Sequence, residues 1–477
     1  MSNDLKTKTF SNLIWRFAER CGAQGVAFVV SIVLARLLTP SDYGTLALVV
    51  VFTNILQILV DTGISSALVQ KKDADELDFS TVFYANIVFC IVVYGIAFAF
   101  APFVAAFYGD ASLTAIIRVL SITILISGIK NIQQAYVSKN LIFKKFFFSS
   151  LAGILGSAIV GIVMAYNGFG VWALVAQQVT NNFINAIVMW FTVKWRPKIL
   201  FSFERLKGLV GYGWKILVSN LINTVYNDIR QLIIGKVYSS ADLAYYNRGK
   251  QFPVFIVSNT NTAIDSVLLP VMSQKQDDRQ QVKNLTRRSI QISSYIMWPL
   301  MFGLMAIGEP LIRVLLTEKW IECVPYLYIF CFVNGMMPIH TANLNAIKAM
   351  GRSDMYLKLE IIKKSGGLLL IISSMHISVF AMAISSIVYT IFASVVNSFP
   401  NKKLLDYSYW EQIKDILPSF VLSASMAIIV YLLPLDFLNI YAELIIKIIV
   451  GAVIYVLGSI CFKLESFTYV KNLVIKR

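Results

Sequence analysis

The sequence predicts an all-α, polytopic membrane protein with about fourteen transmembrane helices. Apolar residues make up 57% of the 477 residues, charged residues make up 14%, and the mean hydropathy is +0.69. A soluble domain has about 45–50% apolar and about 25% charged residues, so this chain has too little polar surface to face water. The apolar residues gather in runs long enough to span a bilayer, and basic residues gather in alternate turns between the runs.

A transmembrane helix needs about 20 mostly apolar residues. The weakest candidate is 361–375, because Lys363 and Lys364 interrupt its start. If that run and the next formed a single helix, every later turn would lie on the other side of the membrane. The fourteen predicted spans are approximately 12–38, 43–69, 80–106, 113–136, 147–166, 171–193, 209–237, 243–272, 290–315, 323–347, 361–375, 378–397, 416–433 and 438–462.

The basic residues strongly favour one side of this arrangement. If the N-terminus is inside, the even-numbered turns hold the lysine and arginine clusters. The opposite turns, which include TPSD, FYGDAS and YNGFG, contain one basic residue, Lys319. Cytoplasmic turns are enriched in Lys and Arg, so we expect an even number of spans with both termini in the cytoplasm. The net charge of +16 then reflects basic turns that face anionic lipid, and no nucleic acid partner is expected.

Several classes of function are disfavoured. The outer turns are too short to hold an external catalytic domain, so we do not expect an enzyme. The chain contains no G-x-x-x-x-G-K-[ST] segment, which excludes a P-loop ATPase within this polypeptide. His340 and His376 are its two histidines and none of its five cysteines has metal-ligand spacing, so no metal site, cofactor or disulfide is expected. Energy for transport across the membrane would come from an ion gradient, the membrane potential or consumption of the transported product.

The chain also contains a weak internal repeat at an offset of 200 residues. Residues 36–42 (RLLTPSD) align with residues 236–242 (KVYSSAD), and six of the 33 positions from 36 to 68 are identical in the two copies. Each copy is an outer turn that ends in an Asp where a helix N-cap is wanted. Six helices separate the copies, so the two halves have the same orientation. We expect an N-terminal lobe at 1–200, a C-terminal lobe at 201–400, two further helices and a tail at 401–477, and a cavity between the lobes.

Several segments resemble the polysaccharide exporters of the multidrug/oligosaccharidyl-lipid/polysaccharide flippase superfamily. The resemblance is strongest to the Wzx-like O-unit flippases of lipopolysaccharide, colanic acid and teichuronic acid pathways. The segments are WRFAERCGAQGVAFVVSIVLARLLTPSDYGTLAL near the start, VDTGISSALVQKKDADELDFSTVFYAN after it, LAYYNRGKQFP at 243–253 and LDYSYWEQIKDILPS at 405–419.

This resemblance implies a MATE-like fold of two pseudo-symmetric six-helix lobes plus two C-terminal helices. It also implies a location in the bacterial plasma (inner) membrane. The implied activity is flipping of an undecaprenyl-pyrophosphate-linked oligosaccharide from the cytoplasmic to the outer leaflet, for polysaccharide or lipopolysaccharide (O-antigen) biosynthesis. A polysaccharide polymerase and assembly proteins would be further partners.

Polar side chains inside the spans give candidates for a lumen. A charge at the bilayer centre costs about 2.5–3.5 kcal/mol on insertion scales, so it usually faces a cavity or a partner. Arg16, Arg20 and Gln24 share one face of the first helix, and Glu19 can pair with Arg16. These four residues are predicted to line a lumen, and the alternative is that the arginines extend to the cytoplasmic headgroups.

The seventh predicted helix is the most polar. Asn220, Asn223, Asn227 and Arg230 follow a 3-4-3 spacing, and Asp228 lies beside them. One neighbouring helix could not satisfy so many polar groups, so this stripe predicts a water-filled lumen.

Other polar residues have simpler interpretations. The second and sixth predicted helices each carry a stripe of polar side chains, mostly amides, which favours helix packing. Asp61, in the stripe of the second helix, is also a lumen candidate. Arg248 near the start of the eighth helix is either a lumen residue or a headgroup contact. The isolated residues are expected to lie at helix ends or in satisfied pairs; they are Arg118, Lys130, Glu309, Arg313 and His340.

A lumen of arginines and amides suits a lipid-linked oligosaccharide. Arg stays charged and offers a planar fork to phosphate oxygens, and Asn and Gln both donate to and accept from sugar hydroxyls. The main alternative is a cation-coupled multidrug antiporter of the same fold, which would need a cluster of carboxylates and aromatic faces for an organic cation. A membrane glycosyltransferase, polymerase or ligase is a third hypothesis, disfavoured by the short outer turns.

Overall fold

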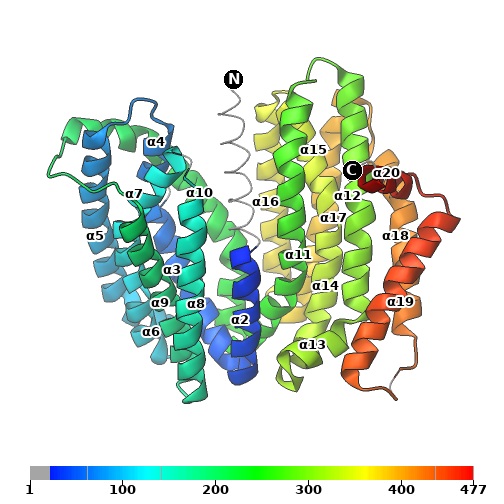
Figure 1. The fold of residues 1–477 in the computed structure, drawn as a ribbon, viewed down its shortest axis with the longest axis horizontal. Coiled ribbons are helices and arrows are strands. Elements are labelled where there is room, and N and C mark those ends of the chain that lie inside the picture. Colours follow the sequence, from blue (N-terminus) through cyan, green and yellow to red (C-terminus); the bar gives the residue numbers. More distant parts are fainter. Residues whose placement is uncertain (1–21, 62, 141, 436, 476–477) are drawn as a thin grey trace. The chain divides into compact units, whose positions relative to one another are not determined.

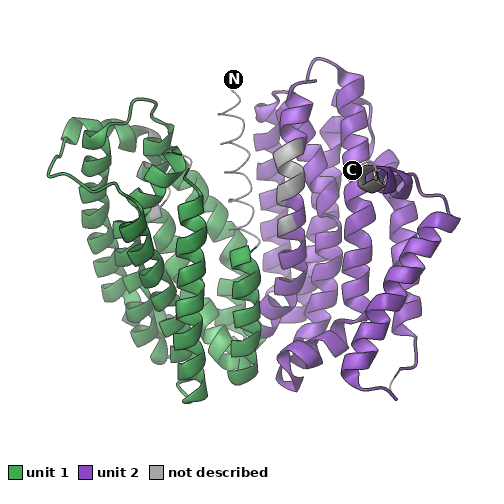
Figure 2. Cartoon of the chain, viewed as in Figure 1, with its two compact units in different colours: residues 1–244 green, residues 245–477 purple. Residues whose placement is uncertain are grey.

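The described chain is built from helices joined by turns and short linkers. The computed structural model describes residues 22–475 except 62, 141 and 436, and no strand occurs among them. The chain divides by packing into two compact units, residues 1–244 and residues 245–477 (Figure 2). An all-helical fold is expected in lipid, because a helix satisfies its backbone polar groups within one segment.

Unit 1 contains nine of the described helices and the first turn of a tenth (Figure 1). These are α2 (Gln24–Leu37), α3 (Pro40–Asp61), α4 (Gly63–Gln70), α5 (Glu76–Tyr108), α6 (Ser112–Leu120), α7 (Ile122–Lys139), α8 (Lys144–Tyr166), α9 (Val171–Thr192), α10 (Phe203–Val237) and the start of α11 (Ser240–Ser273).

Unit 2 contains the rest of α11 and the helices that follow it. These are α12 (Arg279–Ala306), α13 (Gly308–Leu316), the 3-10 helix η2 (Glu318–Cys323), α14 (Val324–Gly335), α15 (Met337–Ala349), α16 (Ser353–Ser374), α17 (Val379–Leu405), α18 (Tyr409–Tyr431), α19 (Ile440–Cys461) and α20 (Glu465–Ile475).

The helices agree with the predicted spans, although several spans are broken. Among the described residues, eight helices are long and apolar enough to cross a membrane, or nine if the bent pair α12–α13 counts as one span. The prediction of a polytopic all-α protein is confirmed, and a count of fourteen spans is consistent with this structure. The bend of 70° between α12 and α13 lies at Ile307, shortly before Pro310, which has no backbone N–H to donate to the helical ladder.

The weakest predicted span is a separate helix. A turn at residues 375–378 separates α16 from α17, and the two helices pack together. The side chain of Lys363, which made the sequence signal weak, is 8% exposed, and its Nζ lies 2.5 Å from Oε1 of Glu360 one turn earlier. This pairing lowers the cost of placing a lysine inside the helical bundle.

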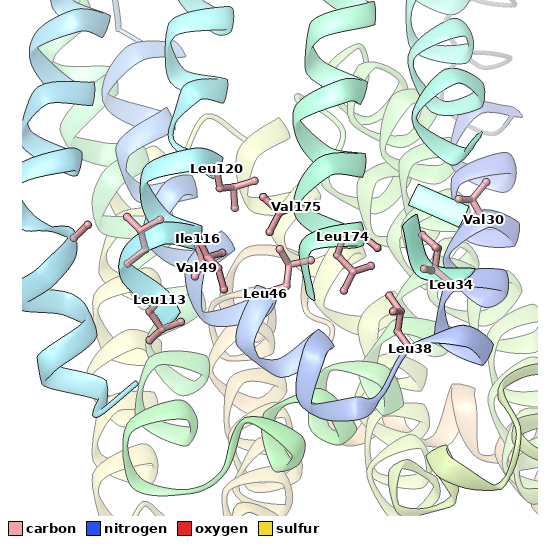
Figure 3. Close-up of a cluster of buried hydrophobic side chains, with 14 of the residues drawn as sticks. Val30, Leu34, Leu38, Leu46, Val49, Leu113, Ile116, Leu120, Leu174 and Val175 are labelled. Atoms are coloured by element: carbon pink, nitrogen blue, oxygen red, sulfur yellow. The ribbon is translucent and has the colours of Figure 1, made fainter. Parts of the chain in front are cut away.

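A cluster of branched aliphatic side chains holds unit 1 together. Leucine, isoleucine and valine side chains from α2, α3, α6 and α9 point toward one another, among them Leu34, Leu46, Ile116 and Leu174 (Figure 3). Each of these four side chains is less than 8% exposed. Because lipid tails are as apolar as leucine, this cluster stabilises the unit through close packing more than through removal of apolar surface from water.

The helices α8 and α9 of unit 1 pack closely together. A Cβ added at Gly153 of α8 would lie 2.5 Å from Oδ1 of Asn181 on α9, and one added at Gly161 would lie 3.0 Å from Cβ of Gln177. Small residues on one helix face allow two backbones to approach in a bilayer. The amides of α9 therefore contribute to packing, as expected for that stripe.

The two copies of the repeat have the same local structure. The helix before each repeated turn ends at Leu37 or Val237, and the Asp side chain of each turn accepts hydrogen bonds from the residue three positions earlier. Thr39 donates its backbone N–H (3.0 Å) and its hydroxyl (2.6 Å) to Asp42. Ser239 donates the same two groups to Asp242 at 3.2 and 2.6 Å.

The prediction that each Asp is the N-cap is wrong. The backbone N–H of each Asp binds the hydroxyl of Thr39 or Ser239 in return, so the hydroxyl residue is the N-cap and the Asp is the third helical residue of a capping box. Two identical boxes at an offset of 200 residues support the repeat more strongly than the six sequence identities do.

The two repeated turns also touch each other. The hydroxyls of Ser41 and Ser240 lie 3.1 Å apart, and a Cβ added at Gly44 would overlap the backbone carbonyl of Ser240. Backbone cannot rotate out of the way as a side chain can. The first turn of α3 can therefore approach the first turn of α11 this closely because residue 44 is glycine.

The compact units differ from the predicted lobes. Packing places the boundary at Ala244, which leaves α10 in unit 1, whereas the repeat assigns residues 201–400 to the second half. Packing and repeat length are different properties, so lobe boundaries at 200 and 400 stay a prediction.

We predict that Gly44→Ala destabilises the protein by about 1–3 kcal/mol, the usual cost of overpacking, because the new methyl group forces α3 away from Ser240. Gly95→Ala in α5 is the matched control, since a Cβ there meets nothing within 4 Å and alanine favours a helix. Thermal unfolding of the purified proteins in detergent measures the difference. Equal melting temperatures for the two variants would contradict the prediction.

Candidate functional site

The candidate site is the polar stripe of α10. Asn223 and Asn227 are exposed, and Asn220 and Arg230 are partly buried on the same side of the helix. Lys215 and Ser219 continue the stripe toward the start of α10 at four-residue spacing and are also exposed. The structure thus brings four of the predicted lumen residues onto one surface of unit 1.

Three faces of α10 have different surroundings. One face packs on α3, α4 and α5 within unit 1. A second face presents exposed Trp214, Val218, Ile222 and Val225, which suit contact with lipid. The third face is the polar stripe, in which Asn223 and Asn227 are exposed beside the apolar face of the same helix. An ordinary packing role would instead have covered these amides with a neighbouring helix.

Asp228 is separate from that stripe. Its side chain is partly buried, and Oδ1 accepts a hydrogen bond of 2.9 Å from Nε2 of Gln231. Asp228 follows Asn227 directly and is thus turned by about 100° around the helix from it. The carboxylate orients Gln231, and its predicted part in substrate binding stays a prediction.

The linker before α10 explains why this helix lies in unit 1. The backbone N–H groups of Lys198 and Ser202 each donate a hydrogen bond of 3.0 Å, to the hydroxyls of Ser80 and Thr81 respectively, at the start of α5. Ser202 is also the N-cap of α10, because its hydroxyl accepts from the backbone N–H of Arg205. The first turn of α10 is therefore attached to α5.

A buried carboxylate strengthens this attachment. Asp78 of α5 is fully buried, and its carboxylate receives Lys71 Nζ at 2.6 Å and Arg205 Nη1 at 3.2 Å. Asp75 is the N-cap of α5 and pairs with the same arginine at 3.6 Å. Removing one partner of a buried ion pair typically costs about 3–5 kcal/mol.

Asp78 was not among the residues singled out from the sequence. The signal was present as Asp75-Glu76-Leu77-Asp78, in which the first and last residues form a capping box. The backbone N–H of Asp78 donates to Asp75 and lowers the pKa of that carboxyl below its usual range. The two cations that meet at Asp78 come from distant parts of the chain, so the sequence pattern does not show them.

A cavity of about 610 Å³ adjoins this cluster. It is lined by Gln70, Lys71, Glu204 and Arg205 together with small and apolar residues. Lys71 and Arg205 are already bound to Asp78, and Glu204 adds a negative charge. The cavity is therefore a polar recess of mixed charge at the end of unit 1 that carries its basic turns.

Arg248 is enclosed within unit 2. The residue is 5% exposed, its Nη1 donates to Oε1 of Gln251 at 2.6 Å, and its guanidinium lies 4.9 Å from the ring centroid of Trp320 in η2. These contacts stabilise the start of α11 against η2. The structure does not bring Arg248 to an open surface, and its predicted role in substrate binding stays a prediction.

The remaining predicted residues are not tested by these contacts. Arg16, Glu19 and Arg20 lie outside the described residues. Gln24 is exposed at the first residue of α2, and Asp61 is the last residue of α3, where its side chain is not described.

The isolated charged residues are satisfied, as predicted. Arg118 donates from Nε to the carbonyl of Phe98 at 3.3 Å, and Lys130 donates to Oδ1 of Asn182 at 3.3 Å. In unit 2, Arg313 pairs with Glu309 at 2.8 Å. These side chains stabilise contacts between or within helices and are not part of the α10 stripe.

Known proteins with the same fold include two transporters. The chain resembles the structure of the lipid II flippase MurJ in an inward-closed conformation, with a TM-score of 0.74, 15% identity and coverage of 94% of this chain and 98% of that chain. It also resembles an inward-facing multidrug resistance MATE family transporter of the MOP superfamily, with a TM-score of 0.64, 13% identity and coverage of 80% and 94%. The expected MATE-like fold is therefore confirmed.

Sequence relatives belong to polysaccharide pathways. The teichuronic acid biosynthesis protein TuaB of Bacillus subtilis (strain 168) is 26% identical over 424 residues, which cover 86% of this chain and 85% of the relative. The lipopolysaccharide biosynthesis protein WzxC of Escherichia coli (strain K12) is 22% identical, with coverage of 90% and 88%. Residues 33–325, more than half of the chain, match the family described as polysaccharide biosynthesis proteins. This multi-pass membrane protein therefore belongs to the family of polysaccharide biosynthesis proteins.

Proposed function

We propose that this protein is a secondary transporter that flips an undecaprenyl-pyrophosphate-linked oligosaccharide from the cytoplasmic to the outer leaflet of the bacterial inner membrane. The supporting observation is the polar stripe of α10, in which exposed amides stand between Lys215 and Arg230 on a helix that also carries an exposed apolar face. Such a surface suits a ligand with a charged headgroup, hydroxyl-rich sugars and a lipid tail.

The chemistry of the stripe agrees with each part of that ligand. Cations at the stripe can bind pyrophosphate oxygens, and the guanidinium of Arg230 can do so with two parallel hydrogen bonds. Asn223 and Asn227 can donate to and accept from sugar hydroxyls. The apolar face around Ile222 leaves room for the lipid tail in the bilayer while the headgroup moves.

The relatives support the same substrate class. Their names place them in teichuronic acid and lipopolysaccharide biosynthesis, and the structural relative MurJ is a lipid II flippase. A transporter in such a pathway needs neighbouring proteins that make its substrate and polymerise its product. We infer that polymerase and assembly proteins are functional partners of this chain.

A cation-coupled multidrug antiporter is the alternative, because a MATE transporter shares the fold. Such a protein would need a carboxylate on its ligand-binding surface. Among the described residues of the α10 stripe, the exposed groups are amides, a hydroxyl and a lysine, and the nearby carboxylate of Asp228 is hydrogen-bonded to Gln231. The stripe therefore favours an anionic glycolipid over an organic cation.

The proposed orientation places both termini in the cytoplasm. The basic turns of unit 1, with Lys71, Lys139 and Lys198, then face the cytoplasm, and the repeated turns at Thr39 and Ser239 face the outside.

We predict flipping without nucleotide in a purified system. Proteoliposomes that contain the protein and a fluorescent lipid-linked oligosaccharide should expose the glycan in the outer leaflet in the absence of ATP, as measured by accessibility to a membrane-impermeant glycosidase. Because moving a charge across the field is worth about 2.3 kcal/mol per 100 mV, collapse of the potential or pH gradient with ionophores should change the rate. A strict requirement for ATP would overturn the assignment as a secondary transporter.

We predict that Arg230→Ala lowers the flipping rate in the same assay by about tenfold or more, since a hydrogen bond to a charged group is worth about 1.5–3 kcal/mol. Arg230→Lys should retain partial activity, because it keeps the charge and loses the fork. Lys72→Ala is the control: it removes an exposed cation from the turn between α4 and α5, outside α10. Wild-type flipping by Arg230→Ala at equal protein level would remove this residue from the mechanism.

We predict the topology from single-cysteine labelling in a variant that lacks the five native cysteines. A membrane-impermeant thiol reagent added to intact spheroplasts should label cysteines at the exposed positions Asn167 and His376, and should not label cysteines at Asp277 or Lys471. His376 lies in the turn between α16 and α17, so it tests the weakest span directly. Protection of position 376 together with labelling of position 471 would show that α16 does not cross the membrane.

A further inference from the structure

A polar cavity with two arginines in its wall lies within unit 2 and shares no residue with the α10 stripe. A cavity of about 240 Å³ opens between the first turns of α12 and the helix α20. Its lining side chains are rich in hydrogen-bond donors, and they are Asn284, Arg287, Arg288, Gln291, Ser466 and Tyr469, with Ile292 and Glu465 completing the wall.

The arginines of this cavity have different constraints. Arg287 donates from Nε (3.1 Å) and Nη2 (2.7 Å) to Oδ1 of Asp415, which is 6% exposed. Gln291 donates to the same oxygen at 3.1 Å. Asp415 therefore fixes the orientation of Arg287 and Gln291 at the cavity wall, and Nη1 of Arg287 takes no part in that pair.

Arg288 supplies a cation that is not shared with Asp415. Its guanidinium carbon lies 3.6 Å from the ring centroid of Tyr469, so the guanidinium stacks on that ring. A stacked guanidinium keeps its in-plane N–H donors available for oxygen acceptors. The charged groups at the cavity wall are Arg287, Arg288 and Glu465. Because Asp415 pairs with Arg287, Arg288 provides the positive charge that an anionic ligand would contact.

The position of the cavity along the helices indicates that its ligand is a lipid. One turn beyond Ile292, α12 begins its exposed apolar surface with Ile296 (39% exposed). At the other wall, α19 ends its exposed apolar surface with Ile460 and Phe462, after which the chain turns at Lys463 into α20. The cavity therefore lies where the lipid-facing band meets the polar end of unit 2, which is the level of the headgroups.

The helix α20 is held in a position that suits binding of a lipid headgroup. Leu464, just before α20, and Phe467 in its first turn pack against the cluster that contains Tyr295, Met426 and Tyr455, so α20 packs on α12, α18 and α19. Figure 1 shows α20, in dark red, running across its neighbours instead of along them. An amphipathic helix in this attitude lies in the interface plane, where basic side chains attract anionic lipid.

We propose that this cavity binds the phosphate of an anionic phospholipid headgroup, with Arg288 as its principal cation. Arg287, Ser466 and the hydroxyl of Tyr469 supply further hydrogen bonds, and Ile292 contacts the start of the acyl region. The site is distinct from the transport stripe on α10 and does not depend on the proposed transport activity.

Native mass spectrometry of the full chain tests this proposal. The wild-type protein, delipidated in detergent, is mixed with phosphatidylglycerol or with zwitterionic phosphatidylcholine, and retained lipid is counted. We expect preferential retention of phosphatidylglycerol, and a loss of about tenfold in Arg288→Gln, because one charge-assisted hydrogen-bond set is removed. Tyr469→Leu removes the stacking ring and should give a smaller loss in the same direction.

Arg279→Gln is the matched control. It removes the same charge from the first turn of α12, where Arg279 is exposed and donates to the carbonyl of Lys403 outside the cavity. Equal lipid retention by Arg288→Gln and Arg279→Gln would overturn the proposal, as would equal retention of the two lipids by the wild type. A rise in melting temperature with inorganic phosphate that matches the rise with phosphatidylglycerol would assign the cavity to a soluble anion and also overturn it.

Discussion

The absence of water from the bilayer core is the constraint on which this structure depends. Backbone polar groups there must be satisfied within the protein, and helices do this within one segment. The consequence is visible where helices break: Gly308 and Pro310 lie at the bend between α12 and α13, and the residues around the breaks remain within packed bundles. The same constraint makes each polar side chain in a span informative, because it must find a partner, a cavity or a ligand.

Polar side chains therefore have two kinds of role here. Some are wholly or partly buried within a bundle and stabilise it, such as Lys363 with Glu360 or Lys130 with Asn182. Asn223 and Asn227 of α10 are instead exposed, on a helix that also has a packed face and an apolar face. That contrast within one structure supports a ligand-binding role more strongly than the number of polar residues does.

The ends of the helices organise the units. Capping boxes at Thr39–Asp42 and Ser239–Asp242 start α3 and α11 in the same way, and Gly44 lets the two turns touch. At the opposite end of unit 1, buried Asp78 joins Lys71 to Arg205 and so attaches α10 to α5. Basic residues thus bind buried carboxylates in this protein, and we propose that they also orient the chain in the membrane and bind phosphate groups.

The sequence by itself determined the all-helical membrane fold, the separation of α16 from α17 and the repeat at 200 residues. It could do so because hydropathy, the distribution of basic residues among the turns and the capping residues are local properties of the chain. It also identified the α10 stripe, since four-residue spacing places side chains on one face. Tertiary structure decided which polar groups stay exposed. Arg248 is enclosed by Gln251 and Trp320. The ion pair of Asp78 with Arg205 and the contact of Arg288 with Tyr469 join residues that are far apart in the chain. No local pattern encodes such contacts, because they arise when separate helices pack together.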